Sequence, residues 1–276
     1  MALVARGASS LAGISGSSSG AAGAPRARCR PRPPFAPTVA IVTFVTVVTI
    51  VLGAPGAAPG AAAGERLSLY HPGVITYYGF VEAPVEVRSA PSAFAHGVLR
   101  LSTKTPDGTS MLIEAIAMIT GSGHRQWLEI HMPILPNSRT GWIPASAVSR
   151  LVPLRTWLVV DTKHLHIRLV ESGHTIFSAR IGVGARGTPT PHGNFYVIDR
   201  LTDLPHGGPY GPLAFGTSAK SAKLTDWPGG GVVGIHGTNQ PNLIPGHPSH
   251  GCIRLRNADI LRLGRLLPVG TPVTVE

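Results

Sequence analysis

The stretch from Ile235 to Asn257, which reads I-H-G-T-N-Q-P-N-L-I-P-G-H-P-S-H-G-C-I-R-L-R-N, places the strongest constraint on how this chain folds. Prolines and a glycine at positions 241, 245, 246 and 248 disfavour a helix between the histidines. We therefore expect His236 to end a strand, and a loop to return the chain to Cys252.

Cys252 is a candidate nucleophile, because it is the only cysteine downstream of the one long apolar segment. A free thiol has a pKa of about 8.5, so it needs a cation or a proton acceptor nearby to react near neutrality. His236 and His250 are candidates for that base. Gly251 permits a tight turn that can aim backbone N–H groups at an oxyanion, and Ser249 and His250 can support the turn. This pattern favours acyl transfer.

The motifs H-G-T-N and S-H-G-C-I-R together resemble the signature of the L,D-transpeptidase family of bacterial cell-wall enzymes, the YkuD-like family. Two upstream segments fit the same family. Gly182 to Val197 resembles its T-P-x-G-x-F segment, and Val159 to Val170 resembles its opening hairpin. The resemblance implies a mainly β fold, with a β-sandwich catalytic domain and a short helix over residues 155–276.

The resemblance also implies an activity, that of a peptidoglycan L,D-transpeptidase without a cofactor or metal. Its partners would be two stem peptides, a donor and an acceptor. Cys252 would attack the donor, form a thioester and release D-Ala, and an acceptor amine would then complete a 3→3 cross-link. If water replaces that amine, the same site is an L,D-carboxypeptidase.

Within this scheme His236 is the expected base and Cys252 the nucleophile. The backbone N–H groups of Gly251 and Cys252 would hold the oxyanion, while His250 would steady the loop or share in the charge relay. Ser249 would support the turn. Gly237 implies that a backbone carbonyl, rather than a side chain, orients the base.

Two further residues are expected to contact substrate. Arg254 could hold a substrate carboxylate through a bidentate contact, although a salt bridge that braces the loop is an equal alternative. Many family members carry Asn at this position, which leaves the donor and acceptor details open. Tyr210 lies in a Gly- and Pro-rich segment, residues 204–231, that resembles a flap over a cleft.

Three other interpretations of the same residues remain. His236, His247, His250 and Cys252 include enough potential ligands for zinc, but the usual C-x2-C and H-x3-H spacings are missing. Alternatively, the fold has lost its activity and only binds the cell wall. A buried inert cysteine is disfavoured, because Ser-His-Gly before Cys252 is polar and favours a turn.

The N-terminal region is expected to direct export. Residues 1–37 predict a disordered basic leader, and residues 38–63 predict a signal peptide, cleaved near Ala63, or a retained membrane anchor. Five arginines precede the apolar run, which places them inside and the chain from about Gly64 outside the cytoplasm. They also contribute five of the net +11 charges, so the basic balance does not indicate nucleic-acid binding. Cys29 would be cytoplasmic and incidental.

Residues 65–151 predict a separate small β domain. Short strands are expected at residues 74–80, 85–87, 97–101, 112–119, 127–131 and 141–143. The ending Gly141 to Val148, G-W-I-P-A-S-A-V, resembles a bacterial SH3-like β-barrel, a module that could bind wall polymer. Trp127 and Trp142 are expected to be buried in this barrel rather than to line a ligand groove.

In the C-terminal region, apolar alternation predicts strands at residues 158–160, 164–170, 175–183, 195–199 and 272–275. The second strand would place His164, His166 and Arg168 on one solvated face. Residues 257–267 predict a helix with Asn257 as its cap.

Overall fold

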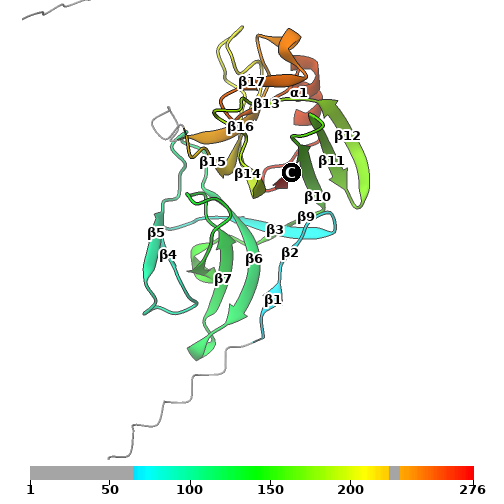
Figure 1. The fold of residues 1–276 in the computed structure, drawn as a ribbon. Coiled ribbons are helices and arrows are strands. Elements are labelled where there is room, and N and C mark those ends of the chain that lie inside the picture. The colour runs from blue at the N-terminus through cyan, green and yellow to red at the C-terminus, as the bar shows by residue number, and fades with distance from the viewer. Residues whose placement is uncertain (1–64, 224–230) are drawn as a thin grey trace, which may run out of the picture. The chain divides into compact units, whose positions relative to one another are not determined.

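The computed structural model describes residues 65–223 and 231–276 of the 276-residue chain (Figure 1). The basic leader, the apolar segment predicted to be a signal or anchor, and residues 224–230 of the predicted flap lie outside the described residues. Among the residues that are described, no helix combines the length and the apolar character needed to cross a membrane. Residues 65–276 belong to a single compact unit.

A nine-stranded antiparallel sheet forms the first half of this unit, in the order β2-β3-β6-β7-β8-β4-β5, with β1 beside β6 and β9 beside β3. Alternation of apolar and polar residues produces it, as in β4, where Val85 and Val87 are buried and Glu86 is exposed. The strands are β1 (Leu67–Ser68), β2 (Tyr70–His71), β3 (Ile75–Phe80), β4 (Val85–Arg88), β5 (Gly97–Leu101), β6 (Leu112–Thr120), β7 (Gln126–His131), β8 (Thr140–Pro144) and β9 (Val152–Leu154).

The predicted strands of this region are confirmed within one or two residues, and short 3-10 turns occupy Ser122–His124 and Ala145–Ala147. Trp127 is 3% exposed, as expected, whereas Trp142 is only partly buried. The likeness to an SH3-like barrel stays a prediction.

A ten-stranded mixed sheet forms the second half, in the order β12-β11-β10-β19-β14-β15-β16-β18-β13-β17. Its elements are β10 (Thr156–Asp161), β11 (His166–Glu171), β12 (His174–Arg180), β13 (Gly182–Gly184), β14 (Gly193–Leu201), β15 (Ala214–Lys220), β16 (Val232–His236), a 3-10 turn (Pro241–Leu243), β17 (Gly246–Ser249), β18 (Ile253–Arg254), α1 (Asn257–Gly264) and β19 (Pro272–Val275). Strand β14 pairs with β19 through its first residues and with β15 through its last. The main core packs β10 and β11 against β15, β16 and α1, so the chain is mainly β.

Four predictions for this half need correction. The strand predicted over residues 175–183 is two strands, because β12 ends at Arg180 and pairs with β11, whereas β13 begins at Gly182 and pairs with β17 and β18. The strand predicted from His164 begins at His166, because a turn precedes it in which Leu165 has a φ of 54°. The segment predicted as an irregular flap contains β15, a strand paired on both sides. Helix α1 ends at Gly264 rather than Leu267 and has Arg256 as its N-cap. The predicted strand at residues 272–275 is confirmed.

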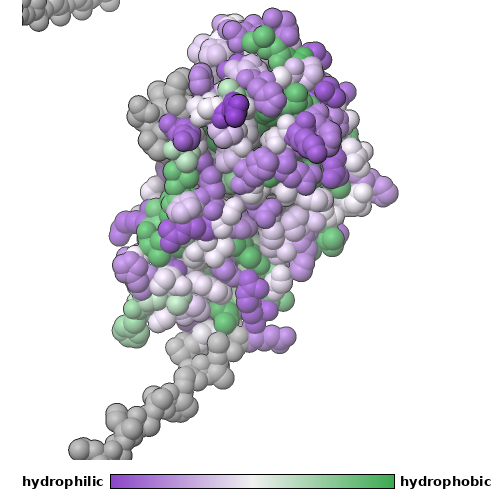
Figure 2. Space-filling model, viewed as in Figure 1, coloured by the Kyte–Doolittle hydropathy of each residue, from purple (hydrophilic) through white to green (hydrophobic). Residues whose placement is uncertain are grey.

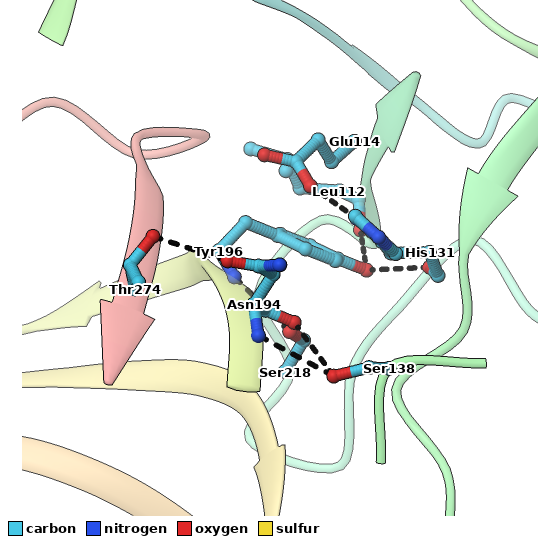
Figure 3. A network of polar contacts seen from close by, with 8 residues as sticks. All are labelled: Leu112, Glu114, His131, Ser138, Asn194, Tyr196, Ser218 and Thr274. Atoms are coloured by element: carbon cyan, nitrogen blue, oxygen red, sulfur yellow. Dashed lines mark hydrogen bonds and ion pairs between the residues drawn. The ribbon is translucent and has the colours of Figure 1, made fainter. Parts of the chain in front are cut away.

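A buried polar network joins the two sheets around Tyr196 of β14 (Figure 3). The Tyr196 hydroxyl donates to the carbonyl of Leu112 at 3.4 Å and lies 3.5 Å from that of His131. The Nδ1 atom of His131 lies 2.5 Å from a carboxylate oxygen of Glu114, which is fully buried. These contacts fix the first sheet against the second. The face in Figure 2 is largely hydrophilic, with hydrophobic residues in small patches.

Candidate active site

Strand register brings the candidate catalytic residues to one face of the second sheet. Strands β16 and β18 run parallel, with Ile235 opposite Ile253 and His236 opposite Arg254. The two isoleucines are buried in the core, at 0% and 1% exposure. Because side chains alternate along a strand, His236 and Arg254 project to the other face, and so does Cys252, which directly precedes Ile253.

Gly234 lies next to both the thiol and the imidazole. Its N–H donates to Sγ of Cys252 at 3.4 Å. A Cβ atom at this position would lie 3.7 Å from Cδ2 of His236 and 4.0 Å from the same sulfur. Both side chains therefore lie over a single glycine, and a larger residue would occupy the space between them.

A backbone carbonyl sets the orientation and the tautomer of His236. Its Nδ1 atom lies 2.6 Å from the carbonyl oxygen of Gly237, which is the contact expected from the glycine at this position. A carbonyl can only accept, so Nδ1 carries the proton of the neutral ring and Nε2 is left as the acceptor. Tyr210 packs edge-on against the imidazole, with ring centroids 4.9 Å apart. The ring is therefore held with Nε2 able to accept a proton.

The pKa values of the pair keep both groups neutral at rest. The pKa of His236 is lowered to about 4, mainly by burial and also by the positive charge of Arg254, while the bond to Gly237 opposes the shift. Burial raises the pKa of the Cys252 thiol, against the Gly234 N–H and the Arg254 charge, which both lower it. At neutral pH the site thus holds a thiol beside a neutral imidazole.

A chain of hydrogen bonds fixes the loop before the cysteine. The buried Ser249 hydroxyl donates to the Cys252 carbonyl at 2.6 Å and accepts from the N–H of Gly251 at 3.1 Å. The Thr190 hydroxyl donates to the Gly251 carbonyl at 2.9 Å and accepts from the N–H of Gly184 at the same distance. Gly251 has a φ of +119°, a conformation that favours glycine. Because the N–H of Gly251 already donates to Ser249, it is not available to an oxyanion. Gly251 contributes its backbone conformation to the site.

Arg254 makes few polar contacts within the described residues. Its Nε atom is buried and has no hydrogen-bond partner in residues 65–223 and 231–276. Its Nη1 atom makes one long contact of 3.4 Å to the amide oxygen of Gln240. The salt bridge considered as an alternative does not form within these residues. Because a buried donor without a partner is costly, the Nε group of Arg254 is suited to a hydrogen-bond acceptor on a ligand.

A cavity of about 220 Å³ opens over this face. It is lined by Pro209, Tyr210, Ser221, Gly231, Val232, Val233, His236, Ser249, His250, Cys252 and Arg254. Six of the eight residues predicted for the site line it. Gly237 and Gly251 support it from behind through the backbone contacts described above. His250 is exposed at the cavity.

The sequence analysis did not predict the supporting roles of three residues. Gly234 is recognisable only by its place two residues before His236 on a strand, and Thr190 by its place in the T-P-T-P run. Asn257, expected to cap the helix, instead accepts the N–H of Thr238 at 2.8 Å and so holds the loop after His236. The zinc alternative has no structural counterpart: in the described part of the chain, no three potential ligands gather closely enough to hold a metal ion.

Comparison with known proteins identifies the catalytic half. Residues 155–275 match the model of the YkuD family, the L,D-transpeptidase catalytic domain. The chain is 39% identical over 134 residues to the L,D-transpeptidase-family protein YkuD of Bacillus subtilis. The aligned region covers 49% of this chain and 73% of that protein. It is 32% identical over 133 residues to YkuD of Bacillus licheniformis, covering 48% and 72%.

Among solved structures, the catalytic domain of the Enterococcus faecium L,D-transpeptidase is 25% identical, with a TM-score of 0.33. The match covers 44% of this chain and 96% of that domain. The sequence relatives, rather than this likeness, carry the assignment. Since residues 155–275 match the family model and the chain covers 73% and 72% of the two Bacillus YkuD proteins at 39% and 32% identity, the chain belongs to the YkuD family of L,D-transpeptidases.

Proposed function

We propose that this chain is a peptidoglycan L,D-transpeptidase that works through a thioester on Cys252. The observation that carries the proposal is the shared face of β16 and β18, where an imidazole with Nε2 unprotonated and a thiol lie over one glycine. Membership of the family supplies the substrate class, a peptidoglycan stem peptide.

In the first step His236 Nε2 takes the proton of the Cys252 thiol as the sulfur attacks the carbonyl of the third stem residue. The oxyanion forms next to the backbone N–H of Cys252, which has no partner among the described residues. The C–N bond to D-Ala then breaks, and the imidazolium returns the proton to the departing amine. A thioester and free D-Ala result.

In the second step the side-chain amine of an acceptor stem attacks the thioester. Neutral His236 accepts a proton from that amine, the new amide forms, and the sulfur leaves as a thiolate that is reprotonated. The product is a 3→3 cross-link. Arg254, with its unpartnered Nε, would hold a carboxylate of the stem beside the reacting carbonyl. His250, at the mouth of the cavity, would steady the cysteine loop.

Two statements about the rest of the chain belong to the same proposal. Residues 38–63 would serve as a signal peptide or an anchor that places residues 65–276 outside the cytoplasm, where the substrate is found. The first sheet would act as an SH3-like module that binds wall polymer near the catalytic half.

The test is product analysis of the full chain incubated with a disaccharide tetrapeptide. We expect release of D-Ala, formation of a dimer and a mass adduct on the peptide that contains Cys252. Cys252→Ala should abolish all three, whereas Cys29→Ala, which removes the other thiol of the chain, should change none. D-Ala release without dimer would mean carboxypeptidase activity. No turnover and no adduct would leave a wall-binding protein.

A further inference from the structure

A second cavity, of about 540 Å³, lies between the two sheets. Residues of β5 and of the loop after it line one side, and residues of β14 and β15 line the other. Its size falls within the range of about 300 to 1,000 Å³ that is usual for sites that bind small molecules. The mechanism above makes no use of it.

Hydrogen bonds between the sheets hold the walls of this cavity in place. The Thr109 hydroxyl donates to a carboxylate oxygen of Asp199 at 3.1 Å. The amide side chain of Asn137 bonds both backbone groups of Lys220, donating to its carbonyl at 2.8 Å and accepting its N–H at 2.9 Å. Fixed walls reduce the cost of ordering a bound ligand.

The large cavity adjoins the active-site cavity at one residue, Val232, which lines both. Val232 pairs with Lys220 across β15 and β16. Lys220 lines the large cavity, and the next residue, Ser221, lines the active-site cavity. Neighbouring α-carbons are about 3.8 Å apart, so the linings of the two cavities meet at the end of β15.

The chemistry of the cavity fits an anionic peptide. Leu101, Met111 and Ile134 supply apolar walls for aliphatic groups. The half-buried Lys220 makes no hydrogen bond or ion pair with its ammonium group among the described residues, although Asp107, which also lines the cavity, acts on its charge. By contrast, the carboxylate of Asp199 is satisfied by Thr109 and by the N–H of Gly216. Burial lowers the pKa of Lys220, although the charge of Asp107 opposes this, so a ligand carboxylate would relieve the desolvation of the cation.

We propose that the cavity between the sheets is a second substrate subsite, in which Lys220 binds a carboxylate of the stem peptide whose carbonyl reacts at Cys252. The identity of the ligand rests on the proposed function, whereas the subsite itself rests on the cavity, its junction at Val232 and the unpaired ammonium. It gives the first sheet a direct part in substrate binding.

The test measures binding apart from turnover. Calorimetry on the full chain carrying Cys252→Ala compares a stem tetrapeptide with free side carboxylates and the same peptide with those carboxylates amidated. Adding Lys220→Met, which keeps the methylene chain and removes the charge, should weaken binding of the free acid by about tenfold, as expected for one charge-assisted hydrogen bond. Binding of the amidated peptide should not change with this substitution.

Lys223→Met is the matched control, because this exposed lysine lies three residues away and lines neither cavity. It should leave both affinities unchanged. An equal loss for both peptides with Lys220→Met, no loss, or no binding of the free acid would overturn the subsite. The proposed function is judged separately, by D-Ala release from the chain with Cys252 intact, so either idea can fail without the other.

Discussion

Acidification should leave this enzyme active to an unusually low pH, because burial keeps His236 neutral. A shift of its pKa from 6.5 to about 4 corresponds to roughly 3 kcal/mol against the imidazolium. At pH 5 such a ring remains about 90% neutral, whereas a solvated histidine of pKa 6.5 would be about 3% neutral. The thiol adds no titration in this range, since burial raises its pKa.

The assay is the rate of D-Ala release at low substrate concentration, compared at pH 5 and pH 7. We expect the rate at pH 5 to be about nine tenths of that at pH 7, and the acid limb to lie near pH 4. Arg254→Met should move the limb to higher pH, because the guanidinium charge also lowers the pKa of His236. Circular dichroism at both pH values controls for unfolding.

A rate at pH 5 of only about 4% of the rate at pH 7 would refute this reasoning, because that ratio is expected for a histidine of unperturbed pKa. It would mean that water reaches the ring in the free enzyme. A rate that rises with pH below neutrality as the Cys252 thiol loses its proton would show that the reactive form is a thiolate–imidazolium pair. That result would contradict a resting state in which both groups are neutral.

Glu114→Gln should remove a pH dependence of the free energy of unfolding. Burial raises the pKa of Glu114 to about 7, so between pH 4.5 and 7 the folded state binds a proton that the unfolded state does not. The free energy of unfolding of the parent therefore falls by roughly 3 kcal/mol as pH rises through that window. Urea unfolding at pH 5 and pH 8 checks this, and equal slopes for variant and parent would contradict it. Ser249→Ala leaves the carbonyl of Cys252 and the N–H of Gly251 without their partner, and should lower the free energy of unfolding by about 1 to 3 kcal/mol. The loss is measured as a lower melting temperature. An unchanged melting temperature would count against these hydrogen bonds. Gly234→Val should lower the acylation rate at least about 100-fold by separating imidazole and thiol, with Gly234→Ala milder, and similar rates for both would argue against the shared space.

Strand positions could be predicted where the pattern was local. The strand at residues 112–119 was predicted one residue short of β6, and that at residues 272–275 matches β19, because a short run of apolar and β-branched residues bounded by turn formers carries the signal in a few positions. Strand β15, A-F-G-T-S-A-K, has no such pattern. It forms because β14 and β16 hydrogen-bond it on both edges, which no local sequence reports.

Asn257 shows the same limit at the level of one side chain. An asparagine at the start of an apolar periodic segment is typical of a helix cap, and the helix does begin there. Its oxygen is nevertheless taken by the N–H of Thr238, nineteen residues earlier in the chain. Distant backbone donors compete with local ones, and the fold decides between them.

By itself, the sequence indicated the kind of chemistry and the candidate residues for it: a thiol after the apolar segment, a separated histidine and a glycine turn are properties of residue type and spacing. Only the tertiary structure decided how they work together. The parallel register of β16 and β18 brings His236 and Cys252 over Gly234, the Gly237 carbonyl selects the tautomer, and burial shifts the pKa values. These depend on distances between segments and on exclusion of water, which exist only once the chain has folded.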